Sequence, residues 1–192
     1  MDYDVFIGVD SSLTGCGVTT LVGRDSKPYH CGSLSLPTGV TGGERLYEIC
    51  RYIRRAIPKE FGAAYAAMEG PSYASVHDSF KMGEAYGVTK FAVYDACRVE
   101  ATVVAPTRLK LYATGDGSAD KDDVIHAVKH HWLHDVHGDD NAADSFALAH
   151  LARALVIGPG RRRCEAQVVH DILHPDANKA VRVKHRRSKE NI

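Results

Sequence analysis

The sequence predicts an α/β domain in which a mixed five-stranded sheet carries helices on both faces. Three observations lead to this fold class. Three consecutive apolar segments near the N-terminus have short connections, helical segments then alternate with two further strands, and two helices close the folded part. The resulting order is β-β-β-α-β-α-β-α-α, without an internal repeat in the sequence.

Five segments have the composition of strands and are bounded by turn residues. They are residues 4–10, 16–23, 27–36, 63–69 and 100–106. Because short connections join the first three, we expect them to form an antiparallel meander with the third strand at the edge. The first and fourth strands both end in a carboxylate, at Asp10 and Glu69.

Four helices follow from apolar residues spaced three or four positions apart. Residues 42–57 form an amphipathic helix, and a longer helix runs from about residue 77 to residue 98. A third helix starts near Ser118, which is a suitable N-cap. The last helix lies in the segment 138–155.

Bulk properties are those of a globular protein outside the membrane. The chain has 192 residues, of which 44% are hydrophobic and 25% charged. Its apolar runs are shorter than the roughly 20 residues of a membrane span, and the N-terminus lacks a signal-peptide pattern. The five cysteines are scattered without a CxxC pair, which argues against disulfides and zinc and predicts a cytoplasmic location.

The charge is asymmetric along the chain. Residues 161–192 hold nine Lys and Arg against four Asp and Glu, although the whole chain is neutral. We expect a folded domain over residues 1–158 and a basic extension over residues 159–192 with little regular structure. A basic extension is typical of polyanion binding, so Arg161, Arg162 and Arg163 are candidate DNA contacts, and a merely solubilising terminus is the alternative.

Acidic residues stand where the last helix should enter the core. Asp144 continues the apolar stripe of Leu148, Leu151 and Leu155, and Asp140 lies one turn before it. Carboxylates in the first turn of a helix often serve only as caps that complement its dipole. A buried unpaired carboxylate, however, costs several kcal/mol unless it is neutralised or binds a metal.

A shared context favours the metal site over separate caps. If the first and fourth strands are parallel neighbours, Asp10 and Glu69 lie side by side at their carboxyl ends, and the last helix supplies Asp144. Carboxylate oxygens select Mg²⁺ or Mn²⁺. Two such ions would clamp the attacking water and the leaving oxygen of a phosphodiester. Turn-forming residues at both strand ends remain the alternative for each carboxylate alone.

Four segments together resemble the blocks of the RuvC family of Holliday-junction resolvases. They are "IGVDSSLTGCGV", "AAMEGPSY", "GSADKDDVIHAV" and "DDNAADSFALAH", in the family's order and spacing over roughly residues 4–157. The spelling of the last block is closer to phage-encoded members. The resemblance implies a ribonuclease H-like fold and a dimeric, Mg²⁺-dependent endonuclease with two ions per site, for which Mn²⁺ would substitute. Such an enzyme nicks two symmetric strands of a four-way junction and leaves 5′-phosphate and 3′-hydroxyl ends.

The resemblance also implies roles for individual residues. Asp10 would bridge both metal ions, Glu69 would be the ligand of the second block, and Asp144 would be the last ligand. Lys110 and Lys121 match basic positions near the phosphates, and Lys121 is also a candidate catalytic residue.

Two positions depart from the family pattern. The family places Asp or His three residues before its final Asp, where this chain has Asn141. Either Asp140 or Asn141 would complete the metal shell, and we favour Asp140, which is also a candidate catalytic carboxylate. The family's junction-opening aromatic corresponds to Ser72, so Tyr73, one residue later, is the candidate DNA-stacking residue or an ordinary loop aromatic.

The expected partner is four-way or otherwise branched DNA. The helix over 77–98 has Gly83 and Gly87 four residues apart, which allows close approach of a second copy of the chain or ordinary packing on its own sheet. A branch-migration helicase is a partner that the sequence does not identify. The alternatives are a flap or fork endonuclease, a junction-binding protein that cuts weakly because of Asn141, and an ATPase, for which the chain is too short.

Overall fold

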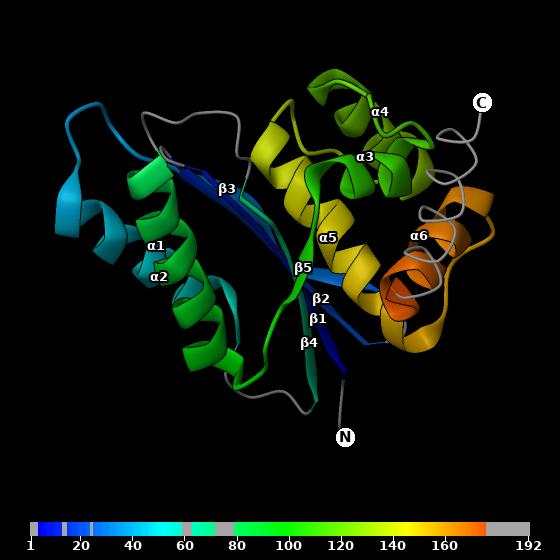
Figure 1. Ribbon diagram of the computed structural model, residues 1–192, viewed down its shortest axis with the longest axis horizontal. Coiled ribbons are helices and arrows are strands. Elements are labelled where there is room, and N and C mark those ends of the chain that lie inside the picture. The colour runs from blue at the N-terminus through cyan, green and yellow to red at the C-terminus, as the bar shows by residue number, and fades with distance from the viewer. Residues whose placement is uncertain (1–3, 13–14, 24, 59–62, 72–78, 176–192) are drawn as a thin grey trace, which may run out of the picture.

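The computed structural model describes residues 4–12, 15–23, 25–58, 63–71 and 79–175, and a five-stranded sheet lies at its centre (Figure 1). The strands are β1 (Val5–Ser11), β2 (Gly15–Val22), β3 (Lys27–Ser35), β4 (Ala64–Glu69) and β5 (Thr102–Val104). They are arranged in the order β3-β2-β1-β4-β5. Because β1–β3 are antiparallel neighbours and β4 and β5 run parallel to β1, the predicted mixed sheet is confirmed.

Helices cover both faces of this sheet (Figure 1). On one face lie α1 (Gly42–Ala56) and α2 (Ser79–Cys97). On the other face α5 (Asp140–Ile157) crosses β1, β2 and β4. Around α5 pack α3 (Pro106–Thr114), α4 (Lys121–His131) and α6 (Arg163–Leu173).

The alternation of side chains along β1 divides the core into two layers. Ile7 and Val9 are buried among residues of α1 and α2, whereas Phe6 is buried with residues of α5. Asp10 follows the same alternation and belongs to the α5 layer. This placement carries its carboxylate to the end of the sheet where α5 begins.

Two helix starts differ from the sequence-based expectation. Pro106 opens the unpredicted helix α3 rather than only ending a strand, because proline is well suited to the first helical position. The next helix begins at Lys121 with Asp120 as its cap, not at Ser118. Asp120 and Asp123 bond each other's backbone N–H groups in a capping box, which a serine three residues from Lys121 does not provide.

A further unpredicted helix, α6, occupies the start of the basic extension. Val168 and Val169 of α6 are buried in the same core as Tyr112 and Ala113 of α3. Glu165 occupies a buried position of this helix, where a sequence pattern would require an apolar residue. The apolar spacing alone therefore did not predict α6. The packed structure therefore continues past residue 158, and residues 176–192 lie outside the described residues.

Two expectations about the chain's surroundings can be compared with the fold. All five cysteines are free thiols, as predicted. Among the described residues, no helix is both long enough and apolar enough to cross a membrane.

Candidate active site

The site begins with two carboxylates at the ends of adjacent parallel strands. Val9 of β1 pairs with Met68 of β4, so the next residues, Asp10 and Glu69, stand at the same level. Asp10 is only 5% exposed, and its neighbour on the adjacent strand is Glu69. The predicted adjacency of Asp10 and Glu69 is therefore present.

The first two turns of α5 add Asp140 and Asp144, four residues apart on one face of the helix. Two glycines let this helix lie directly on the sheet. A Cβ added to Gly17 would stand 2.0 Å from the backbone oxygen of Asn141, and one added to Gly8 would stand 1.9 Å from that of Ser145. Without side chains at these two positions, α5 approaches closely enough for its carboxylates to interact with Asp10.

Asp139, the residue before α5, fixes the start of the helix. Its carboxylate accepts hydrogen bonds from the backbone N–H of Ala142 at 2.9 Å and from the hydroxyl of Ser33 at 2.6 Å. Since Ser33 lies on β3, the cap also anchors α5 to the sheet edge. The capping role considered for this segment therefore belongs to Asp139, and Asp144 is left for the site.

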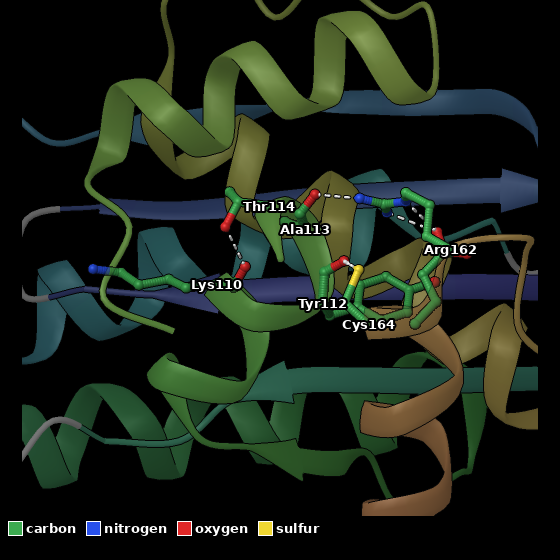
Figure 2. A network of polar contacts seen from close by, with 7 residues as sticks. Lys110, Tyr112, Ala113, Thr114, Arg162 and Cys164 are labelled. Atoms are coloured by element: carbon green, nitrogen blue, oxygen red, sulfur yellow. Dashed lines mark hydrogen bonds and ion pairs between the residues drawn. The ribbon is translucent and has the colours of Figure 1, made fainter. Parts of the chain in front are cut away.

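Two lysines supply positive charge. The ammonium group of Lys121, at the start of α4, forms an ion pair with Asp140. Lys110 lies on α3, which begins two residues after Val104, the register partner of Glu69. Its charge partly opposes the rise in pKa that burial causes for Glu69 and Asp144. Figure 2 shows the Lys110 side chain extending from α3, away from Arg162.

The carboxylates have unequal acidity. Burial, together with the nearby charge of Asp10 and Asp140, raises the pKa of Asp144 to about 7. Burial is also the main cause that raises the pKa of Glu69 and, more strongly, that of Asp10, which additionally faces Glu69. Only Asp140 has a lowered pKa, because Lys121 hydrogen-bonds to it. The two lysines thus leave an excess of negative charge that a cation would neutralise.

The donor set has the chemistry of a hard divalent cation. Carboxylate oxygens from Asp10, Glu69, Asp140 and Asp144 suit Mg²⁺ or Mn²⁺ better than zinc. Within the part of the chain that the structure describes, no three His, Cys, Asp or Glu side chains stand close enough together to enclose an ion.

With this geometry established, comparison with known proteins identifies the family. The family model of the crossover junction endodeoxyribonuclease RuvC matches residues 6–151. This chain belongs to the RuvC family. The matched segment runs from β1 into α5 and contains all four carboxylates and both lysines.

Curated RuvC relatives agree with this assignment. The crossover junction endodeoxyribonuclease RuvC of Synechococcus sp. (strain WH7803) is 31% identical over 148 residues, which cover 74% of this chain and 94% of the relative. RuvC of Parasynechococcus marenigrum (strain WH8102) is 30% identical with the same coverage.

Solved RuvC structures share the ribonuclease H-like fold. The Thermus thermophilus RuvC structure is 24% identical and superposes with a TM-score of 0.57, covering 76% of this chain and 90% of that chain. T. thermophilus RuvC in complex with Holliday junction substrate is 22% identical, with a TM-score of 0.63 and coverage of 80% and 96%.

Arg161, Arg162 and Arg163, at the start of the basic extension, lie away from the carboxylate cluster. They follow α5, whose 18 residues span about 27 Å, whereas the site lies at its first two turns. Arg161 and Arg163 are exposed. Arg162 bonds to Ala113 and Glu165 within the protein, and contact of these arginines with DNA stays a prediction.

Two other predicted residues have different outcomes. The backbone of Asn141 rests on Gly17, whereas Asp140 acts electrostatically on both Asp10 and Asp144. This arrangement favours Asp140 as the fourth ligand, which stays a prediction. Tyr73 lies outside the described residues.

Sequence reasoning missed the residues that position the carboxylates. Gly8 and Gly17 interrupt strands that are otherwise rich in bulky residues, and such glycines often mark a close backbone approach. That signal was available. The bond between Ser33 and Asp139, which are 106 positions apart, had no counterpart in the sequence.

Proposed function

We propose that this chain is a metal-dependent Holliday-junction resolvase. It cuts two symmetric strands of a four-way DNA junction and leaves 5′-phosphate and 3′-hydroxyl ends. The observation that carries the proposal is the group of four carboxylates where the carboxyl ends of β1 and β4 meet the start of α5, with Lys121 paired to Asp140. Family membership supplies the substrate class.

The carboxylates would hold two Mg²⁺ ions, or Mn²⁺ in their place. Bound ions of this kind lower the pKa of a water nucleophile and stabilise the charge that develops on the phosphate. Asp10, which interacts electrostatically with Glu69, Asp140 and Asp144, would be a ligand of both ions. Because burial raises the pKa of both Asp10 and Glu69, loading the site with metal would favour release of protons from them.

The lysines have separate tasks in this proposal. Lys121 keeps Asp140 ionised and would turn toward a phosphate oxygen when Asp140 takes part in metal binding. Lys110 attracts the scissile phosphate to the carboxylate cluster. Because both lysines would contact phosphates, the affinity for DNA should fall as the salt concentration rises.

A homodimer would present two such sites to symmetric strands. Along α2, Phe80, Gly83, Gly87, Phe91 and Tyr94 form an exposed stripe on one side. The side chains of Phe80 and Phe91 are 78% and 57% exposed, and a Cβ at either glycine would meet nothing within 4 Å. We propose that two copies pack through this stripe, because flat small-residue positions between aromatics allow helices to approach closely.

The test is nicking of a synthetic four-way junction, with linear duplex and a flap as controls, in Mg²⁺ and in Mn²⁺. Symmetric nicks that disappear in Asp10→Asn are expected. Loss in Asp140→Asn with normal cutting by Asn141→Asp would identify Asp140 as the fourth ligand.

Other results would redirect the proposal. Equal cutting of flaps and junctions would indicate a branched-DNA endonuclease of broader specificity. Tight junction binding with no nicks in either metal would indicate a junction-binding protein. A cytoplasmic site of action, in the host if the chain is phage-encoded, and a helicase partner remain predictions.

A further inference from the structure

The C-terminal end of α3 is closed by residues of the last described helix (Figure 2). The Nη1 group of Arg162 donates to the backbone oxygen of Ala113 at 2.6 Å, and the thiol of Cys164 donates weakly to that of Tyr112 at 3.9 Å. These carbonyls belong to the last turn of α3, where a helix has no internal donors for them. Residues from another helix therefore supply the missing cap.

Arg162 is itself held rigidly. Its Nε and Nη2 groups donate to the same oxygen of Glu165 at 3.1 and 2.7 Å, and its guanidinium lies 5.0 Å from the ring centre of Trp132. The side chain of Glu165 is only 6% exposed. A planar guanidinium fixed on three sides is a precise donor, in contrast to a mobile surface arginine.

Rigid capping matters for α3 because the helix is short. Its nine residues are too few for a stable isolated helix, so its position depends on tertiary contacts. The positive charge of Arg162 also stands at the negative end of the helix dipole, where it is favourable. One end of α3 is fixed to β5 through Ala105, and the other end is fixed by Arg162.

Lys110 lies in the middle of this helix, one turn before Ala113. α3 begins two residues after Val104, the register partner of Glu69, so a shift of α3 along or about its axis changes the distance from the Lys110 ammonium group to the carboxylate cluster. Figure 2 shows the Lys110 side chain and the Arg162 contact on opposite sides of the helix end. Arg162 therefore has no direct route to the site except through α3.

We propose that Arg162 is a positioning residue that fixes α3 and thereby holds Lys110 over the carboxylate cluster. The proposal rests on the proposed function for its consequence in catalysis. Arg162 lies beyond residue 151, where the match to the RuvC family model ends, so this brace is an addition to the family-matched segment.

The test replaces the brace without leaving a buried charge unpaired. In the double variant Arg162→Met with Glu165→Gln, methionine keeps the packing on Trp132 but cannot donate to Ala113. The same pair of changes is also made in a Lys110→Ala background. Gln167→Ala, at an exposed position of the same helix, is the matched control, and Arg162→Lys tests rescue by a remaining charged donor.

Two readouts are needed. With junction DNA saturating, the single-turnover cleavage rate should fall about fivefold to tenfold in the double variant while junction affinity stays within about twofold. Hydrogen exchange of residues 106–115 should become faster. In the Lys110→Ala background the brace changes should cause no further fall in rate, and Arg162→Lys should recover part of it.

An equal fall in both backgrounds would overturn the proposal, since Arg162 would then act through general loss of structure. Unchanged exchange in residues 106–115 would also overturn it. If the wild-type protein cuts no branched DNA, the proposed function fails instead. In that case hydrogen exchange alone tests whether Arg162 fixes α3, and faster exchange of residues 106–115 in the double variant supports it.

Discussion

At the scale of single residues, the site concentrates carboxylates whose charges oppose one another. Burial raises the pKa of Asp144 to about 7, and burial together with the charge of Glu69 raises the pKa of Asp10 well above its ordinary value. Each shifted pKa is also a statement about stability, because the unfolded chain ionises these groups at their ordinary values. The metal-free fold therefore carries a cost at neutral pH that binding of a cation would remove.

Asp144 gives the protein a predictable pH dependence. Because its pKa is raised in the folded state, the folded protein binds more protons than the unfolded chain between about pH 4 and pH 7. Stability without metal should therefore fall as pH rises through this window. Denaturant unfolding in chelator should show a smaller fall in Asp144→Asn than in wild type. Identical slopes would mean that Asp144 titrates normally.

Divalent cations should stabilise the folded protein through the same cluster. In about 10 mM Mg²⁺ we expect the free energy of unfolding to rise by about 1–3 kcal/mol, since only the folded state gathers the ligands. Asp10→Asn should lose most of this increase. Asp25→Asn, which removes an exposed carboxylate, is the matched control and should behave as wild type. A similar increase in all three proteins would indicate nonspecific ion binding.

At the scale of elements, the contact that positions the site is the packing of α5 on β1 and β2. Gly8 and Gly17 allow backbone to meet backbone, and the bond between Asp139 and Ser33 fixes the first turn. The position of α5 on the sheet therefore determines where Asp140 and Asp144 lie relative to Asp10. A change in the sheet should affect the site even when no site residue is altered.

Gly17→Ala tests this link. The new methyl group would overlap the backbone oxygen of Asn141, so α5 must move, at a cost of about 1–3 kcal/mol. The melting temperature and the rate of junction cleavage should both fall. Gly32→Ala in β3 is the control, because its Cβ would meet nothing closer than 3.5 Å. Full activity in Gly17→Ala would show that the site tolerates displacement of the helix.

At the scale of the whole molecule, the exposed stripe of α2 lies on the outer side of the helix layer opposite α5. Ala85, Ala92 and Val93 face the core, so the stripe is not needed for packing on the sheet. A large apolar surface left in solvent is typical of an interface. Two symmetric cuts require two sites, which a dimer through this surface would supply.

Gly87→Glu should separate the dimer, because it places a charge in the middle of the stripe. Light scattering should report a monomer, and paired cuts should give way to single nicks. Tyr47→Asp is the matched control, since Tyr47 is 64% exposed and belongs to a different helix, α1. A dimeric Gly87→Glu protein would place the interface elsewhere.

The sequence by itself predicted the mixed five-stranded sheet and pointed to the four carboxylates, and the resemblance to the RuvC family added the two lysines. Apolar runs bounded by turn residues are enough to identify the strands. Asp10 and Glu69 must then lie side by side if β1 and β4 are parallel neighbours. Asp144 was exposed as unusual by its place in an apolar stripe.

Only the tertiary structure decided the contacts of Arg162, the presence of helix α6 and the close packing of α5 on the sheet. Arg162 looked like one of three basic residues in an unstructured extension, but its partners Ala113 and Trp132 are distant in the chain. Burial of Glu165 likewise depends on that pairing. Such contacts form between segments far apart in sequence, so their energies leave no periodic pattern, and the fold itself must bring the partners together.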